Sequence, residues 1–208
     1  MRHTSAQRAL DLALSIAALV ILSPIMAVVA LLVRAEDGGP VIFRQLRAGQ
    51  HGKPFRVLKF RSMHADVKGG PLLDQPLWPD GVPDSFVFKV GAGAEPALTR
   101  IGATLRRLSL DELPQLVNVL RGEMSLVGPR PEILPIVECY SLPQRRRLSV
   151  KPGITGWAQV NYPYGASVED AREKLAYDLY YLRHRSLALD LRILLATVRV
   201  VVMQAGAR

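Results

Sequence analysis

The sequence predicts a mixed α/β protein with one N-terminal membrane helix. Residues 10–33 form an almost unbroken apolar run, and the rest of the 208-residue chain alternates strand-like and helix-like patterns. Hydrophobic residues make up 49% of the chain and aromatic residues only 6%, which fits an aliphatic core with additional surface facing lipid. A chain of this length builds about one domain. We therefore expect residues 1–36 to anchor the protein in a membrane and residues 37–208 to form one compact domain.

The apolar run is long enough to reach across a membrane. Only four positions interrupt it: Asp11, Ser15, Ser23 and Pro24. A straight helix over residues 10–33 would measure about 36 Å, whereas the hydrocarbon core of a bilayer is about 30 Å thick. A signal peptide has a shorter apolar region followed by a cleavage site of small residues, so we exclude it. A buried core helix is the alternative, but about 18 consecutive apolar residues already indicate a membrane segment.

Ser23-Pro24, near the middle of the run, predicts a bend in this helix. Proline lacks a backbone donor and clashes with the carbonyl four residues earlier, here that of Val20. The Ser23 hydroxyl is placed to satisfy the polar backbone that the bend exposes. Basic residues lie on both sides of the run: Arg2, Arg8, Arg34, Arg44 and Arg47. The positive-inside rule then places both ends in the cytoplasm, as in a re-entrant helix; the alternative is an ordinary kinked transmembrane helix.

The remaining patterns predict elements of ordinary length. In chain order these are strands at residues 41–44 and 55–62, a surface loop at 69–96, two helices within 99–121 separated at Ser109 and Pro114, a turn-rich strand at 149–160, and helices at 167–184 and 187–203. Ser167 is the expected N-cap of its helix. The last helix is apolar with interspersed charges, which is typical of a helix packed on the domain or lying at a membrane interface.

The charge balance predicts anionic partners. The formal net charge is +9, from 27 Lys and Arg against 18 Asp and Glu. Nucleic acid, anionic lipid headgroups and a diphosphate substrate all fit such a surface. We see no basic stripe with interleaved aromatic residues of the kind that single-strand binders use, so we expect no nucleic acid. The single cysteine, Cys139, excludes an intramolecular disulfide.

The adjacent carboxylates of Asp111 and Glu112 are the sharpest candidate for chemistry. Ser109 and Glu112 have the spacing of a capping box, which would start a helix here. At a helix N-terminus the free N–H groups and the positive end of the dipole keep a carboxylate ionised. It could then act as a nucleophile or a metal ligand, although plain helix capping is the alternative. Nearby, Arg130 stands between two prolines, and a rigid arginine suits bidentate binding of phosphate.

Several motifs in a fixed order resemble those of the bacterial sugar transferases, the small monotopic polyprenol-phosphate phosphoglycosyl transferases. The matching elements are Ser23-Pro24, Lys59-Phe60-Arg61-Ser62-Met63, Thr99-Arg100-Ile101-Gly102, Leu105-Arg106-Arg107, Leu110-Asp111-Glu112-Leu113-Pro114-Gln115, Ser125-Leu126-Val127-Gly128-Pro129-Arg130-Pro131 and Pro152-Gly153-Ile154-Thr155-Gly156-Trp157-Ala158-Gln159-Val160-Asn161. The stretch that follows Asn161 is similar to the subgroup associated with exopolysaccharide and exosortase systems. Larger members carry further N-terminal membrane helices, so we expect this chain to correspond to the minimal catalytic unit.

The resemblance implies a role for each motif. Asp111 is the implied nucleophile, and Asp111 and Glu112 are the implied Mg²⁺ ligands. The residues implied in binding substrate and its phosphates are Lys59, Arg61, Arg106, Arg130 and Gln159. Many members carry an arginine shortly after Gln-Val-Asn, where this chain has Tyr162-Pro163-Tyr164. Arg147 or Arg172 is the expected substitute.

The implied reaction transfers a phosphosugar from a UDP-sugar to undecaprenyl phosphate, through a covalent aspartyl intermediate and with release of UMP. It would be the first membrane step of exopolysaccharide or glycoconjugate synthesis. The implied enzyme is monotopic in the bacterial inner membrane, with a re-entrant helix, interfacial amphipathic helices, a catalytic domain on the cytoplasmic face and a homodimer as one possible assembly. The competing hypotheses are a protein that only binds anionic lipid or nucleotide sugar, and a transferase that binds its donor without turnover.

Overall fold

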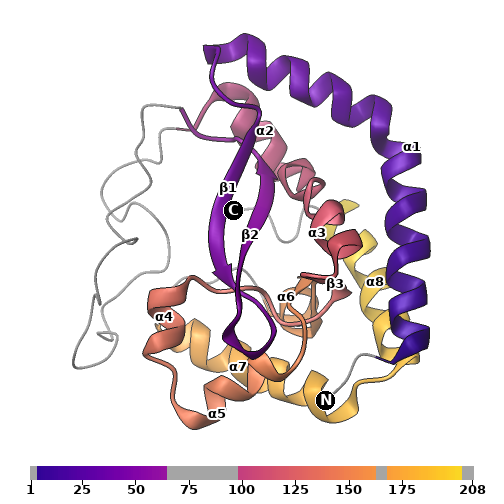
Figure 1. Cartoon of the computed structure of the whole chain (residues 1–208), viewed down its shortest axis with the longest axis vertical. Helices are drawn as coiled ribbons and strands as arrows, with labels where there is room; N and C mark the ends of the chain where they lie inside the picture. The colour runs from indigo at the N-terminus through magenta and orange to yellow at the C-terminus, as the bar shows by residue number, and fades with distance from the viewer. Residues whose placement is uncertain (1–3, 65–97, 163–167, 203–208) are drawn as a thin grey trace.

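The computed structural model describes residues 4–64, 98–162 and 168–202 of the chain (Figure 1). The predicted loop at residues 69–96 and the predicted cap Ser167 lie outside these residues. The described part is mixed α/β, as predicted, with one long apolar helix beside a domain that contains two small sheets.

Helix α1 (Ser5–Asp37) extends beyond the apolar run at both ends. The Thr4 side chain caps its first turn by accepting a hydrogen bond from the backbone N–H of Gln7, and Gly38 ends it in the left-handed conformation at φ 70°. By length and composition α1 could cross a membrane, and only 11% of its most apolar window is buried.

The predicted bend in α1 is confirmed, because Figure 1 shows the helix running along one side of the domain and then turning over its end. Pro24 lies inside the helix, and the Ser23 hydroxyl donates to the Val20 carbonyl over 2.8 Å. The hydroxyl thus serves the backbone group that proline leaves without its usual donor.

The sheets are short and lie in different parts of the domain. Strands β1 (Ile42–Ala48) and β2 (Pro54–Phe60) form an antiparallel hairpin around the turn η1 (Gln50–Gly52), with Ala48 opposite Pro54. Strand β3 (Ser125–Val127) pairs in parallel with β4 (Gly153–Thr155). The hairpin starts and ends close to the predicted strands, whereas only three residues of the predicted strand at 149–160 are extended.

Short helices connect these strands, and two longer helices follow them. In chain order they are α2 (Arg100–Arg107), η2 (Leu110–Glu112), α3 (Gln115–Arg121), α4 (Leu134–Glu138), α5 (Leu142–Arg145), η3 (Arg146–Ser149), α6 (Trp157–Asn161), α7 (Val168–His184) and α8 (Leu187–Val202). Helix α8 buries Ile193 completely and exposes an apolar stripe that includes Leu195 and Val198. It therefore packs on the domain, which is one of the two alternatives predicted for it, and also leaves apolar side chains exposed.

The core joins the hairpin to the C-terminal helices. Val57 of β2, Val119 of α3, Val127 of β3, Tyr181 of α7 and Ile193 of α8 are all buried in one cluster. A second cluster seats the end of α1 on the domain through Val29 and Val33, which pack with Phe60 and Leu105. Because side chains of α2 and β2 meet here, helix α1, the hairpin and the segment before Asp111 share one packing unit.

The predicted capping box at Ser109 is wrong. Ser109 has a φ of 55° and its side chain makes no capping hydrogen bond, and the turn that follows is the single 3₁₀ turn η2. Glu112 does not fold back to the Ser109 backbone because its carboxylate lies between two basic side chains instead. A hydrogen bond between charged partners is stronger than one to a neutral amide, so tertiary contacts override the local motif.

Candidate active site

Asp111 lies in η2, in the corner between α2 and α3, and is only 6% exposed. Burial raises the pKa of its carboxyl above the usual value; Lys59 and Arg106 act in the opposite direction, while Glu112 adds to the rise. Within the described residues no side chain donates a hydrogen bond to this carboxylate. Because most of the Asp111 side chain is shielded from water, its carboxylate is less hydrated than a free one, and such a group is a stronger nucleophile once ionised.

Glu112 is held by two cations at a single oxygen atom. Its Oε1 lies 2.9 Å from Nζ of Lys59 and 3.0 Å from Nη2 of Arg130. Burial alone would raise the pKa of Glu112, but Arg130 and Lys59 outweigh it and hold this pKa well below the usual range. Glu112 is therefore ionised at neutral pH, immediately beside Asp111.

Lys59 reaches this site from the end of β2, and its side chain is largely buried. Burial lowers the pKa of its ammonium group, while the neighbouring carboxylate of Glu112 raises it again. The predicted group of Asp111, Glu112, Lys59, Arg106 and Arg130 is thus gathered at one place from β2, α2, η2 and the loop after β3.

Close backbone packing locks α2 against the end of β2. A Cβ added at Gly102 would lie 2.1 Å from the carbonyl oxygen of Ser62, so only glycine fits. Arg106 Nε donates to Ser62 Oγ over 2.9 Å, and Thr99 caps the helix through the Gly102 N–H. These contacts set the direction in which the chain enters η2 and so place Asp111.

A second close approach sets the loop that carries Arg130. A Cβ added at Gly153 would lie 2.1 Å from the Gly128 nitrogen, so the chain before Pro129 packs directly on β4. Arg130 therefore leaves a fixed backbone, and its 46% exposed side chain turns toward Glu112.

Three other residues named from the sequence are engaged elsewhere. Arg61 is 6% exposed and pairs with Asp37, while also donating to the Val33 carbonyl. The guanidinium of Arg147 lies 2.7 Å from Asp178 Oδ2. Gln159 donates to the Ile154 carbonyl over 2.9 Å. Their role in binding substrate stays a prediction, and the contacts of each also hold the fold.

The family model of the bacterial sugar transferases matches residues 2–204. The chain belongs to the bacterial sugar transferase family. This confirms the resemblance that the motifs indicate.

Curated relatives of this sugar transferase match over most of the chain. It is 42% identical over 202 residues to an uncharacterized sugar transferase, EpsL, of Bacillus subtilis (strain 168), covering 96% of this chain and 89% of that protein. It is 39% identical over 201 residues to UDP-glucose:undecaprenyl-phosphate glucose-1-phosphate transferase of Escherichia coli (strain K12), covering 92% of this chain and 39% of that protein. It is 38% identical over 207 residues to UDP-N-acetylgalactosamine-undecaprenyl-phosphate N-acetylgalactosaminephosphotransferase of Aeromonas hydrophila, covering 97% of this chain and 45% of that protein. The chain spans less than half the length of the last two.

The donor set of the sugar transferase fits a magnesium ion that shares its ligands with a substrate. Mg²⁺ in such sites takes one or two carboxylates and completes its shell with phosphate oxygens and water. Asp111 and Glu112 provide two adjacent carboxylates, and the part of the chain that the structure describes contains no cluster of three or more acidic, histidine or cysteine side chains. Lys59 and Arg130 contact one oxygen of Glu112 and keep its carboxylate ionised, so Asp111 and Glu112 are the residues that would hold the ion.

Two further residues near the site, Asp178 and Arg47, were not selected as site residues from the sequence. Asp178 lies in α7, is buried and pairs with Arg147. Arg47 appeared only as a flanking charge, yet it contacts the loop of Arg130 through the Pro131 carbonyl. Their partners are distant in sequence, so no local motif could have indicated them.

Proposed function

We propose that this sugar transferase moves a phosphosugar from a UDP-sugar to a polyprenol phosphate, with Asp111 as the covalent nucleophile. The observation that carries the proposal is the buried Asp111 carboxylate beside Glu112, Lys59 and Arg130 in a member of this family. The printed names of two relatives, with UDP-glucose and UDP-N-acetylgalactosamine as donors and undecaprenyl phosphate as acceptor, support the substrate classes.

In the first step a carboxylate oxygen of Asp111 attacks the β-phosphorus of the donor. A bond forms between this oxygen and the β-phosphorus, the bond from the β-phosphorus to the bridging oxygen breaks, and UMP leaves with that oxygen and the bonding electrons. In the second step a phosphate oxygen of the polyprenol phosphate attacks the same phosphorus, and the Asp111 carboxylate leaves. Splitting the transfer in this way replaces one difficult displacement by two easier ones.

The basic residues explain how such a crowded anionic site can work. Arg106 and Arg130 are placed to bind the diphosphate and to stabilise the charge that develops on it. Lys59 and Arg130 keep Glu112 ionised and fixed next to the nucleophile. Asp111 and Glu112 would hold Mg²⁺, which supplies charge neutralisation of the diphosphate and of the leaving UMP.

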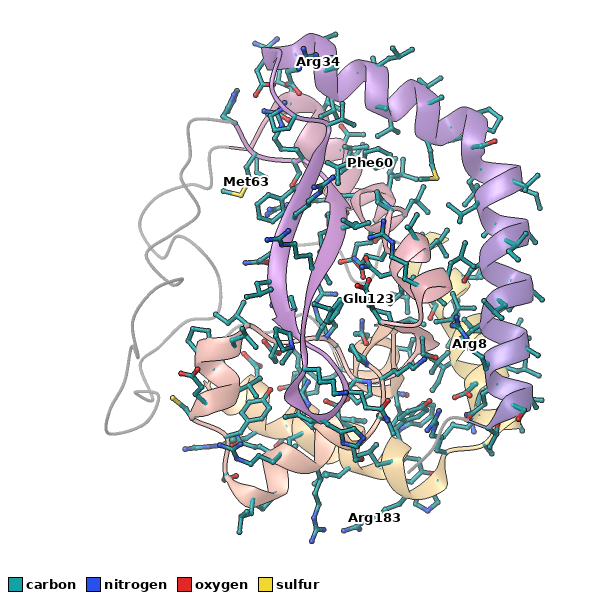
Figure 2. The ribbon with its side chains drawn as sticks, viewed as in Figure 1. Arg8, Arg34, Phe60, Met63, Glu123 and Arg183 are labelled. Atoms are coloured by element: carbon teal, nitrogen blue, oxygen red, sulfur yellow. The ribbon has the colours of Figure 1, made fainter. Side chains whose placement is uncertain are left out.

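We also infer that α1 is re-entrant, because both of its ends are bonded to the same domain. Near its start, Arg8 donates to the carbonyls of Val119 and Leu120 at the end of α3, over 2.7 and 2.9 Å. At its other end, Glu36 accepts hydrogen bonds from the Arg100 and Ile101 backbone, over 2.7 and 3.3 Å. Figure 2 labels Arg8 and Arg34 toward the two ends of the helix.

A helix of this length measures about 50 Å when straight, yet its two ends contact one compact domain. The exposed apolar residues lie between them, with Val20, Ile21 and Leu31 each about two thirds exposed or more. This arrangement lets the bent middle enter the bilayer while the domain stays on one face, which we assign to the cytoplasmic side of the inner membrane. The apolar stripe on α8 provides a second contact with the lipid interface.

The activity is tested by measuring UMP release from a panel of UDP-sugars with purified protein, Mg²⁺ and undecaprenyl phosphate. We expect release with at least one sugar, and a loss on the order of 10³-fold or more in Asp111→Asn. Ala35→Ser, at an exposed position near the end of α1, serves as the control and should keep full activity. Near-normal turnover by a folded Asp111→Asn protein contradicts the nucleophile, and no release from any sugar favours a protein that only binds its ligands.

The membrane placement is tested by single-cysteine labelling in a Cys139→Ser background. Ala6→Cys and Ala35→Cys place thiols at exposed positions near the two ends of α1. A membrane-impermeant maleimide should label both thiols in inverted vesicles and neither in intact spheroplasts. Labelling of the two positions from opposite sides would mean that α1 crosses the membrane.

A further inference from the structure

The loop that carries Arg130 is held at four consecutive backbone carbonyls. Gly153 N–H donates to the Pro129 carbonyl over 2.9 Å, and Ala48 N–H donates to the Glu132 carbonyl over 2.8 Å. Between them, two arginine side chains complete the series. Arg147 Nη2 lies 3.4 Å from the Arg130 carbonyl oxygen, and Arg47 Nη1 lies 3.2 Å from that of Pro131.

Arg47 is itself held in place by its neighbour on β1. Gln45 Oε1 accepts hydrogen bonds from Arg47 Nε and Nη2, over 3.0 and 2.6 Å. The remaining terminal nitrogen, Nη1, is the one that meets the Pro131 carbonyl. Each guanidinium nitrogen of Arg47 therefore has an acceptor, and the guanidinium is directed at the loop that carries Arg130.

Arg147 is held still more firmly. Its Nη1 donates to the Tyr140 hydroxyl over 2.6 Å, and its Nε lies 2.7 Å from Asp178 Oδ2 in an ion pair whose N–H is not aligned for a hydrogen bond. The Arg147 side chain is 13% exposed and that of Asp178 is 3% exposed. Contacts of its three nitrogens with Asp178, Tyr140 and the Arg130 carbonyl hold the Arg147 guanidinium in one orientation, directed at the loop.

We propose that Arg147 and Arg47 are positioning residues, which hold the carbonyls of Arg130 and Pro131 and so direct the Arg130 side chain to Glu112. This rests on the proposed function, in which Arg130 meets the diphosphate. Arg147 then acts through Arg130, which differs from the direct phosphate contact expected from the sequence. Asp178 and Tyr140 contribute to the same positioning because they contact Arg147 and orient its guanidinium.

The physical basis is the mobility of the Arg130 side chain, which would bind the diphosphate. Arg130 is 46% exposed, and a long exposed side chain has many rotamers of similar energy. Fixing its backbone at every neighbouring carbonyl limits the volume its guanidinium can reach. A displacement of about 1 Å at a catalytic group can cost on the order of 10²-fold in rate. Contacts that hold the backbone of Arg130 in place therefore preserve the rate of the reaction.

A double-mutant cycle on UMP release tests the proposal. Arg147→Lys keeps the charge but loses the fork, and we expect about a tenfold loss of kcat/KM for the UDP-sugar. In an Arg130→Ala background the same substitution should cost less than twofold, because nothing is left to position. The matched control is Arg146→Lys, one residue away and exposed, which should change kcat/KM less than twofold in either background.

Two outcomes of this cycle would overturn the proposal. An equal loss from Arg147→Lys in both backgrounds would mean that Arg147 contacts substrate on its own. If Arg147→Lys lowered kcat/KM only at temperatures where its lower Tm leaves part of the protein unfolded, while Arg146→Lys changed neither value, the loss would reflect general destabilisation. Asp178→Asn should reproduce the Arg147→Lys pattern, with a smaller loss of about threefold, because it removes the charge that orients Arg147 but keeps the shape.

Hydrogen exchange followed by mass spectrometry tests the positioning without turnover. Arg147→Lys should speed exchange about tenfold in the peptides that contain the amides bonded to this loop, those of Ala48 and Gly153, and in the peptide that contains the bonded Gly128 amide, and leave peptides of α1 unchanged. Unchanged exchange at all three amides would overturn the positioning role. If exchange rises there while the wild-type protein releases no UMP from any UDP-sugar, the proposed function fails and the positioning of Arg130 stands.

Discussion

Lys59 and Glu112 form the ion pair that joins the end of β2 to the turn of Asp111, with Nζ and Oε1 2.9 Å apart. The pair is mostly buried, with both side chains about one fifth exposed. Removing one partner of a buried pair leaves the other charge without compensation, which costs more than the pair contributes in net stability. Lys59 also acts on Asp111, whose pKa it lowers.

Lys59→Gln should lower kcat/KM by about 10- to 100-fold and move the acid limb of its pH profile to higher pH. Asp111 must be ionised to attack, and without Lys59 its raised pKa rises further. The profile is measured as UMP release across neutral and mildly acidic pH. Lys53→Gln, at an exposed position of the β1–β2 turn, is the control, and an unshifted acid limb in Lys59→Gln would contradict the coupling.

Asp111→Asn should abolish activity and yet raise the Tm at neutral pH. Burial raises the pKa of Asp111, so between the ordinary and the raised pKa the native state binds a proton that the unfolded chain releases. Stability is therefore lost as pH rises through this window, and the ionised carboxylate destabilises the fold above it. Asparagine removes that charge, and each kcal/mol relieved raises the Tm by about 2–4 °C.

The comparison is made by thermal unfolding of both proteins in the same detergent. The gain from Asp111→Asn should shrink as the pH falls toward the ordinary aspartate range, where the native Asp111 is protonated. Glu112→Gln is the contrasting variant and should lower the Tm, because it removes the ionised partner of Lys59 and Arg130. A lower Tm for Asp111→Asn would contradict the argument.

Gly102→Ala should destabilise the domain by about 1–3 kcal/mol, the usual cost of overpacking. The added Cβ would lie 2.1 Å from the Ser62 carbonyl oxygen, and backbone on both sides leaves little room to move. Because α2 sets the position of η2, activity should fall together with the Tm. Ala103→Ser, at an exposed position of the same helix, should change neither, and a full-activity Gly102→Ala protein would mean that α2 shifts freely.

Pro24→Leu should straighten α1 and weaken the docking of one of its ends. Leucine restores the N–H that can bond the Val20 carbonyl, so the bend loses its cause. We expect the Ala6→Cys thiol, introduced with Cys139→Ser, to become accessible from the opposite side of the membrane in part of the population. Ile21→Leu, at an exposed apolar position of the same helix, should leave the labelling unchanged, and identical labelling with Pro24→Leu would show that the end contacts alone impose the bend.

Local patterns were sufficient for much of the fold. The bend of α1 at Ser23-Pro24 and the hydroxyl bond to Val20 depend on residues within one or two helical turns, whereas the helix itself extends beyond the apolar run at both ends. The hairpin and the amphipathic helix α8 likewise follow from short-range alternation and helical period. The pair Asp111-Glu112 and the family were found in the same way, because motifs are contiguous in sequence.

The tertiary structure decided which partner each charged group has. Glu112 matches a capping box locally, but Lys59 and Arg130, distant in sequence, bind its carboxylate. Arg147 was expected as one substitute for the arginine missing after Asn161, and the fold adds contacts to Asp178 and the Arg130 carbonyl that no local motif indicated.

The physical reason is that sequence determines local backbone preference, apolar period and the inventory of charges, all of which act over a few residues. A buried charge instead takes the strongest complementary group that folding brings within hydrogen-bond distance. The sequence by itself therefore determined a bent apolar helix, a mixed α/β domain and an acidic pair among arginines. Only the fold decided that Asp111 keeps a carboxylate without a bonded partner among the described residues, while Glu112 beside it is held by two cations.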